Sequence, residues 1–381
     1  TIPPWLQFCC RRKCVVSAMP NTDVDRRWPV VPLTLYLRIL GVLGASSLVK
    51  IHGHKLPVVA LKVIVGQLSS VFWNSIPSSP SAPVLAVFRK VYDIASKLLS
   101  PHIPVALVKD MHMFVHGSSQ GVIVRLYYPT EPFHALPCIM WYHGGGFTLG
   151  SIDAYDHICC QLARQTQCVV ASVEYRMGPE HSFPTAHEDC YAATKWIWAQ
   201  RVSLGLSPTK PFAVAGDSAG GNIAITVPLQ ANLEPTTCDD ALRIVSVVPI
   251  YPTVSAIGLF PSKREFFNGF PLGMPAIYWF ILQYCPLRWQ QLDWRMALIE
   301  ADRSLLKCLP RTHLIVAEED PLRDEILMFN DLLASLEVPV NMKRFHMKHG
   351  DFGHRFGMGM PSLQWAAMKL REDLHGPAAR L

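Results

Sequence analysis

The sequence predicts an α/β fold, with a mostly parallel central sheet and helices on both of its faces. From about residue 105, short runs of apolar and β-branched residues alternate with longer amphipathic stretches, as strands alternate with crossover helices. The apolar runs are nearly continuous, which is typical of strands buried on both faces. With 50% hydrophobic and 17% charged residues, the composition fits a large core and excludes a disordered chain.

The predicted elements follow one another in that rhythm. Strands are expected at residues 121–129, 135–143, 168–175, 211–216, 243–251, 312–318 and 338–345. Helices are expected at about residues 157–166, 186–201, 219–229, 324–335 and 362–374. The interval 252–300 breaks the rhythm because it holds ten aromatic residues, so it forms either part of the core or a lid over an apolar pocket.

The first 83 residues differ from the rest of the chain. The first 100 residues hold 12 Lys and Arg against 3 Asp, whereas the remainder holds 23 basic and 26 acidic residues. A stretch rich in Pro and Ser at 75–83 marks the boundary. We therefore divide the chain into a basic, apolar N-terminal segment, residues 1–83, and an α/β domain, residues 84–381.

The location of the basic residues excludes nucleic acid as the main partner, since a phosphate-binding surface would place Lys and Arg throughout the folded body. Two apolar stretches, 28–49 and 56–73, are interrupted by Arg38 and Lys62. Three interpretations stay open: a helical N-terminal cap packed on the core, a helix lying on a membrane surface, or a single span. The expected location is cytoplasmic, or membrane-associated on the cytoplasmic or endoplasmic-reticulum side.

The 11 cysteines include no CxxC pair, so neither a disulfide framework nor a zinc ribbon is expected. Most are predicted to be buried thiols in a reducing compartment. The cluster FCCRRKC at 8–14 is similar to a palmitoylation site beside basic residues.

The sharpest chemical signal is GDSAGG at 216–221, between a predicted strand and a predicted helix. A G-x-S-x-G motif in this context is a nucleophile elbow, whose strained turn exposes the serine at the sheet edge. Ser218 is therefore the expected nucleophile. Gly216 and Gly220 stand where no Cβ fits, and Asp217 is expected to form supporting hydrogen bonds beside the serine.

The segment HGGGFTLG at 143–150 directly follows another predicted strand. Consecutive glycines let backbone N–H groups point into a cavity, so we expect those of Gly144 and Gly145, joined by that of Ala219, to bind an oxyanion. His143 and Gly146 complete the motif in supporting roles. The segment lacks the G-x-G-x-x-G and GK[ST] patterns of a phosphate cradle.

A serine nucleophile needs a base and an orienting carboxylate, and two downstream segments offer them where predicted strands end. EEDPLRDE at 318–325 supplies Asp320 or Glu319 as the acid, and HMKHGDFGH at 346–354 supplies three histidines. The same histidines with Asp351 could be imagined as a metal site. That would leave the serine without a base, so neither a metal nor a cofactor is expected.

Four motifs in order, HGGG, GDSAGG, EYRMGPEHSFPTAHED at 174–189 and DPLRDE at 320–325, resemble the hormone-sensitive-lipase-like family of α/β-hydrolase carboxylesterases. The resemblance covers about residues 105–375 and implies an α/β-hydrolase fold. It implies that Ser218 is the nucleophile, Asp320 the orienting acid and His349 the base. The family's histidine usually opens an HGF triplet, whereas this chain has HGD, so His354 and His346 remain alternatives.

The expected activity is hydrolysis of small-molecule esters with short to medium acyl chains through an acyl-enzyme. Two other functions are kept open. One is an arylacetamide deacetylase-like amide and ester hydrolase, which rates on aryl acetamides would reveal. The other is a non-catalytic small-molecule receptor with this fold, which would lack a working histidine.

Overall fold

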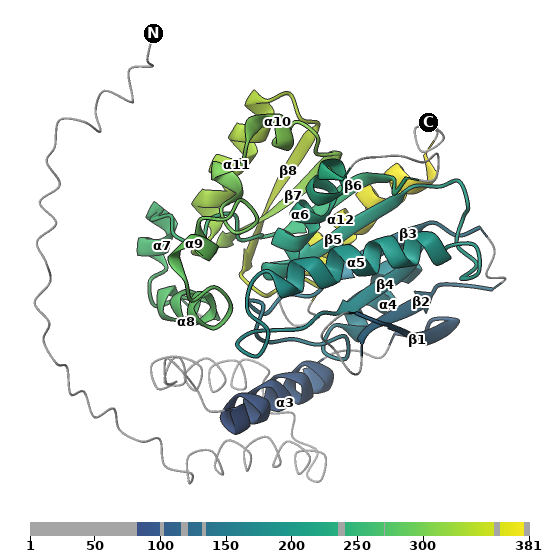
Figure 1. The fold of residues 1–381 in the computed structure, drawn as a ribbon, viewed down its shortest axis with the longest axis horizontal. Helices are drawn as coiled ribbons and strands as arrows, with labels where there is room; N and C mark the ends of the chain where they lie inside the picture. Colours follow the sequence, from purple (N-terminus) through teal and green to yellow (C-terminus); the bar gives the residue numbers. More distant parts are fainter. Residues whose placement is uncertain are drawn as a thin grey trace, which may run out of the picture. The chain divides into compact units, whose positions relative to one another are not determined.

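The computed structural model describes residues 82–99, 103–115, 121–131, 135–234, 241–269, 271–353 and 359–376 (Figure 1). The predicted features of residues 1–81, namely the cysteine cluster and both apolar stretches, lie outside these residues. So does His354, one alternative for the base.

The strands alternate with helices from the first third of the chain to its end. The strands are β1 (Leu107–Met113), β2 (Val122–Tyr128), β3 (Cys138–Tyr142), β4 (Val169–Glu174), β5 (Phe212–Asp217), β6 (Ile244–Ile250), β7 (Arg311–Glu319) and β8 (Val340–Lys348). The helices are α3 (Ala82–Leu99), α4 (Asp156–Thr166), α5 (Thr185–Gln200), α6 (Ala219–Leu233), α7 (Pro261–Glu265), α8 (Met274–Tyr284), α9 (Arg288–Gln291), the 3-10 helix η3 (Leu298–Glu300), α10 (Arg303–Leu306), α11 (Arg323–Ser335) and α12 (Met360–His375).

These strands form one sheet in the order β1-β2-β4-β3-β5-β6-β7-β8. β2 pairs antiparallel with both β1 and β4, and every other neighbouring pair is parallel. The mostly parallel sheet predicted from the sequence is therefore confirmed. Because β3 and β5 to β8 run in the same direction, the loops that follow them meet at one edge of the sheet.

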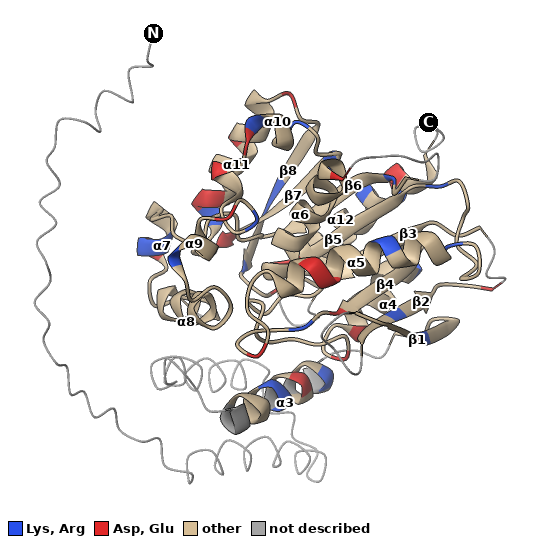
Figure 2. Cartoon of the chain, in the orientation of Figure 1, with Lys and Arg blue, Asp and Glu red and all other residues tan. Residues whose placement is uncertain are grey.

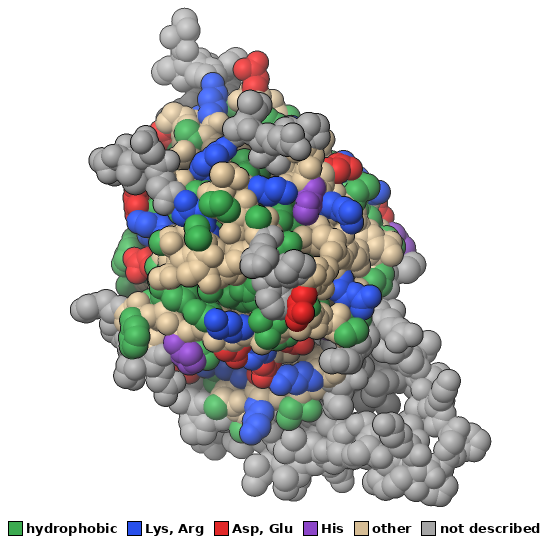
Figure 3. All heavy atoms as spheres, turned by 90° about the vertical axis from the view of Figure 1, so that its right-hand side faces the viewer, with side chains coloured by type: hydrophobic (Ala, Val, Ile, Leu, Met, Phe, Trp, Pro, Cys, Tyr) green, Lys and Arg blue, Asp and Glu red, His purple; other side chains and the backbone are tan. Residues whose placement is uncertain are grey.

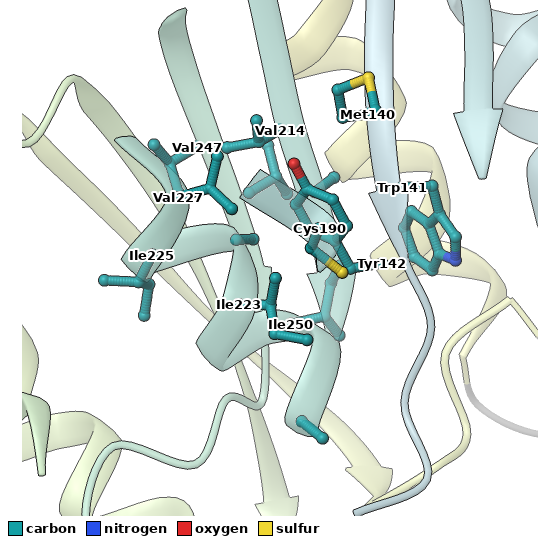
Figure 4. Packing of buried hydrophobic residues seen from close by; sticks show 14 of the residues in the cluster. Met140, Trp141, Tyr142, Cys190, Val214, Ile223, Ile225, Val227, Val247 and Ile250 are labelled. Atoms are coloured by element: carbon teal, nitrogen blue, oxygen red, sulfur yellow. The ribbon is translucent and has the colours of Figure 1, made fainter. Parts of the chain in front are cut away.

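Helices cover both faces of the sheet, as predicted. α5 packs with α6, and α4 packs with α12. In Figure 1, α5 and α6 lie in front of the sheet and α12 lies behind it. Figure 4 shows side chains of β3, β5 and β6 meeting those of α5 and α6. The labelled members are completely buried and hold the elements that flank Ser218: Met140, Trp141, Tyr142, Cys190, Val214, Ile223, Ile225, Val227, Val247 and Ile250.

Charged residues stay away from this core. Figure 2 shows the middle strands of the sheet almost free of Lys, Arg, Asp and Glu. On the face seen in Figure 3, basic side chains are scattered among acidic and apolar ones rather than gathered in a single patch. Among the described helices, none combines the length and the apolar character needed to cross a bilayer. Of the seven cysteines described, all but Cys308 are buried free thiols.

Candidate active site

Four loops at the carboxyl edge of the sheet bring the predicted chemistry together. The glycine-rich loop, residues 143–150, follows β3, and Ser218 stands between β5 and α6. Asp320 comes directly after β7, and His349 directly after β8. Ser218 and His349, 131 positions apart in the chain, thus become neighbours because parallel strands end at the same edge.

Ser218, His349 and Asp320 form a continuous chain of hydrogen bonds. Ser218 Oγ lies 2.9 Å from His349 Nε2, and His349 Nδ1 lies 2.7 Å from Asp320 Oδ2. Asp320 is fully buried, and its second oxygen accepts the backbone N–H of Leu322 at 2.8 Å. Such a carboxylate fixes the imidazole with Nδ1 protonated, which leaves Nε2 free to accept the serine proton.

The backbone at Ser218 has the strain expected of a nucleophile elbow. Its φ of 54° and ψ of −116° lie outside the regions that L-residues normally occupy. The N–H of Ser218 donates to Ile250 O at 2.8 Å, and its carbonyl accepts the N–H of Asn222 at 3.0 Å. A Cβ at Gly220 or at Gly216 would overlap the carbonyl oxygen of Tyr142, so both flanking glycines are required by close packing.

The structure corrects one predicted oxyanion donor. The N–H of Gly144 donates to Asp217 Oδ1 at 2.8 Å, and Gly144 is buried. Its N–H therefore cannot also bind an oxyanion, and the prediction for Gly144 is wrong. Gly145 and Gly146 are partly exposed, and their N–H groups have no acceptor among the described residues.

Asp217 holds the start of the glycine-rich loop. Besides the Gly144 N–H, its carboxylate accepts the hydroxyl of Tyr155 at 2.9 Å. Burial raises the pKa of Asp217 to about 6, against the opposing effect of the Tyr155 hydrogen bond. Asp217 thus connects the residue before Ser218 with the glycine-rich loop and with Tyr155. His143, also in this loop, is completely buried, and burial lowers its pKa to about 4.

Two of the alternative residues are not brought to the serine. The side chain of His346 is 68% exposed, and its ring nitrogens lie 3.6 and 3.7 Å from Glu318 and Glu319. The side chain of Glu319 is 41% exposed, and its carboxylate lies 3.8 Å from Lys348 Nζ. Within the described ranges, no group of three potential metal-ligating side chains is present.

Comparisons with known proteins agree with this geometry. The family model for the alpha/beta hydrolase fold matches residues 139–353. Esterase LipI of Mycobacterium tuberculosis is 32% identical over 277 residues, which is 71% of this chain and 81% of the relative. Ethyl acetate hydrolase of Pseudomonas putida is 31% identical over 221 residues, which is 58% of this chain and 67% of the relative. A solved Pyrobaculum calidifontis esterase superposes with a TM-score of 0.69 at 32% identity and covers 80% of this chain and 97% of its own.

The chain belongs to the hormone-sensitive-lipase-like family of α/β-hydrolase carboxylesterases. It is therefore an ester hydrolase, and its substrates are small-molecule esters.

The aromatic interval of the esterase is partly core and partly a wall beside the active site. Tyr284 is fully buried, and its hydroxyl lies 2.9 Å from His187 Nδ1. Phe280 of α8 lies against the glycine-rich loop so closely that a methyl group on Gly146 would overlap its side chain. Phe267, Tyr278 and Trp289 are exposed.

Several residues that shape the site of the esterase were not singled out from the sequence. The ring of Tyr251 lies 4.6 Å from that of His349. Asn222, directly after the GDSAGG motif, donates to Thr253 O at 2.9 Å and to Arg295 O at 2.8 Å. Its side-chain oxygen accepts His187 Nε2 of α5 at 2.8 Å. Asn222 thus ties α6 both to α5 and to the aromatic interval. Position beside the motif was the only sequence signal for Asn222.

Proposed function

We propose that the esterase hydrolyses carboxylic esters through an acyl-enzyme formed on Ser218. The observation that carries the proposal is the hydrogen-bonded chain from Ser218 Oγ through His349 to Asp320. A serine hydroxyl is a weak nucleophile unless a base removes its proton during attack. His349 Nε2 is within reach of that proton, and Asp320 stabilises the imidazolium that forms.

In the proposed reaction, Ser218 Oγ attacks the carbonyl carbon while His349 Nε2 takes the hydroxyl proton. The carbonyl oxygen becomes an oxyanion, which accepts hydrogen bonds from the N–H groups of Gly145, Gly146 and Ala219. The bond to the alcohol oxygen then breaks, and that oxygen takes the proton from His349. Water attacks the acyl-enzyme with His349 as base, which releases the acid and restores Ser218.

We propose short to medium acyl chains on hydrophobic alcohols as the substrates. Phe280 lies against Gly146, one of the proposed oxyanion donors, and therefore places an apolar wall next to the ester group. A relative of this chain is named for hydrolysis of ethyl acetate, an ester with a short acyl chain. An aromatic wall favours apolar groups and limits the room for long ones.

The location is also a proposal. The basic and apolar residues 28–73 support attachment to a cytoplasmic or endoplasmic-reticulum membrane surface, or packing on the core of a cytoplasmic enzyme. Fractionation of cells that express the full chain would distinguish the two, since only the first interpretation places the protein with membranes at low salt.

Hydrolysis of p-nitrophenyl esters tests the proposed reaction. We expect turnover of the butyrate and hexanoate by the wild type, with slower turnover of the decanoate. Ser218→Ala is expected to lower kcat by on the order of a thousand-fold or more, because the remaining groups cannot form an acyl-enzyme. A wild type without activity on these esters, or an active Ser218→Ala variant, would exclude the mechanism.

A further inference from the structure

Arg89 of α3 joins two loops beside the active site. Its Nε donates to the carbonyl oxygen of Thr148 at 2.8 Å, and its Nη2 donates to that of Gly178 at 2.7 Å. The same guanidinium forms two hydrogen bonds of 2.9 Å with the carboxylate of Glu180. The planar guanidinium thus serves three acceptor groups at once, a geometry that the ammonium of a lysine does not reproduce.

Thr148 is a fixed point of the glycine-rich loop. Its N–H donates to Gly145 O at 3.1 Å, its hydroxyl donates to Gly146 O at 3.1 Å, and its side chain is fully buried. The two carbonyls that Thr148 holds thus belong to the two glycines whose N–H groups are the proposed oxyanion donors. Because Gly145 O belongs to the same peptide group as the Gly146 N–H, a movement of Thr148 is transmitted directly to that donor.

The loop is also joined to the second partner of Arg89. Gly178 N–H donates to Phe147 O at 2.9 Å. Arg89, Thr148, Phe147 and Gly178 are therefore joined in a closed ring, through these hydrogen bonds and the peptide bond between Phe147 and Thr148. Such a ring limits the movement of the glycine-rich loop.

Successive turns of α3 continue this attachment. Asp93 accepts the hydroxyl of Ser151 at 2.9 Å, and Lys97 donates to Asp153 at 2.7 Å. Arg89, Asp93 and Lys97 are four residues apart and hence share one face of the helix. Figure 2 shows basic and acidic residues alternating along α3. The contacts follow the glycine-rich loop and its continuation in chain order, from Thr148 to Asp153.

An apolar contact strengthens the same connection. Leu85 of α3, Leu149 of the loop and Trp279 of α8 pack together, and all three are more than 90% buried. Side chains of one helix thus contact both the loop and the aromatic wall.

We propose that Arg89 is a positioning residue for the oxyanion-binding loop and acts through the carbonyl oxygen of Thr148. The inference rests on the proposed function, since it requires that Gly145 and Gly146 bind the oxyanion. Backbone donors stabilise the transition state only when they are held at the position where the negative charge develops. Arg89 supplies this constraint from outside the loop.

The test compares Arg89→Ala and Arg89→Lys with the wild type, and counts competent enzyme by fluorophosphonate titration of the serine. For Arg89→Ala we expect kcat per titrated serine to fall about 10- to 100-fold, with KM within about two-fold. The Ki of an alkyl trifluoromethyl ketone, which forms a tetrahedral adduct on the serine, should rise by the same factor. The kcat and Ki of Arg89→Lys should lie between those of the wild type and those of Arg89→Ala, because an ammonium cannot serve all three acceptors.

Arg303→Ala is the matched control. Arg303 also holds two backbone carbonyls, those of Ile299 and Ala301 at 2.9 Å, but on a loop that does not carry the donors. Its kcat and Ki should stay within about two-fold of the wild type. A purely structural role of Arg89 would lower the amount of titratable serine and leave kcat per serine unchanged.

Three results would overturn the proposal. Arg89→Ala could lose titratable serine while kcat per serine stays unchanged, or its KM could rise at constant kcat. The third is a loss of kcat in Arg303→Ala equal to that in Arg89→Ala. If Arg89→Ala does not fold, a folded Arg89→Lys with the full kcat and Ki of the wild type overturns it as well. Failure of the proposed function is distinguishable, because the wild type itself would then not react with the fluorophosphonate.

Discussion

Asp217 shows how one side chain decides which backbone groups of a motif are available for catalysis. The glycine run offers three N–H groups, and the sequence alone favoured the first two. Asp217, 73 residues later in the chain, accepts the first N–H and leaves the next two without a partner among the described residues. A contact over that distance depends on the register of β3 beside β5, which no local pattern reveals.

Asp217 should also make the stability of the protein depend on pH. Burial raises its pKa to about 6, whereas an aspartate in an unfolded chain titrates near 3.9. Between these values the folded protein binds more protons than the unfolded chain. The contribution of Asp217 to the free energy of unfolding is therefore fully present below about pH 4 and lost as the pH rises through about 6.

Asp217→Asn tests this dependence, because it removes the titration and keeps an oxygen for the Gly144 N–H. The free energy of unfolding of the variant minus that of the wild type should increase by about 2–3 kcal/mol from pH 4 to pH 7, as measured by urea unfolding. If the difference in the free energy of unfolding between the two proteins is the same at pH 4 and at pH 7, Asp217 does not titrate in this range.

At the scale of helices and strands, the elements with strong periodicity were predictable and the exposed ones were not. The seven predicted strands are present, and Ser218, Asp320 and His349 stand where strands end. β1 was missed because the adjacent charges of Lys109 and Asp110 interrupt the apolar run in LVKDMHM, and because the strand lies mostly exposed beside β2. α3 was missed because it follows directly on the Pro- and Ser-rich boundary. Arg89 was missed with it, since its importance lies in contacts with residues 59 to 91 positions away.

A buried ion pair connects the aromatic interval with the helix that follows Asp320. Lys263 of α7 lies 2.6 Å from Glu325 of α11, and their side chains are 4% and 0% exposed. The second oxygen of Glu325 accepts the N–H of Val254 at 2.9 Å. Removal of one partner leaves a buried charge without a counter-ion, which is costly.

Lys263→Met should therefore lower the free energy of unfolding by about 3–5 kcal/mol in urea unfolding. The double variant Lys263→Met/Glu325→Gln should recover a large part of this loss, because the remaining amide is neutral and still accepts the Val254 N–H. A double variant no more stable than Lys263→Met would show that the unpaired charge is not the cause.

For the whole molecule, low charge content and the assembly of the active site have a common origin in the sheet. Strands buried on both faces leave few positions for charge, and their parallel direction brings distant loops to one edge. The excess of basic residues belongs mostly to residues 1–81, outside the described residues. Under the proposed location, it concerns where the esterase works rather than which reaction it performs.

Mass-spectrometric identification of the residue that carries a fluorophosphonate adduct tests the central claim most directly. In the wild type we predict a single adduct on Ser218. His349→Ala should react at least about a hundred-fold more slowly, because the serine loses its base, whereas His346→Ala should react at the wild-type rate. A wild type that forms no adduct, or forms it on another residue, would contradict the assignment of Ser218, His349 and Asp320 as the catalytic groups.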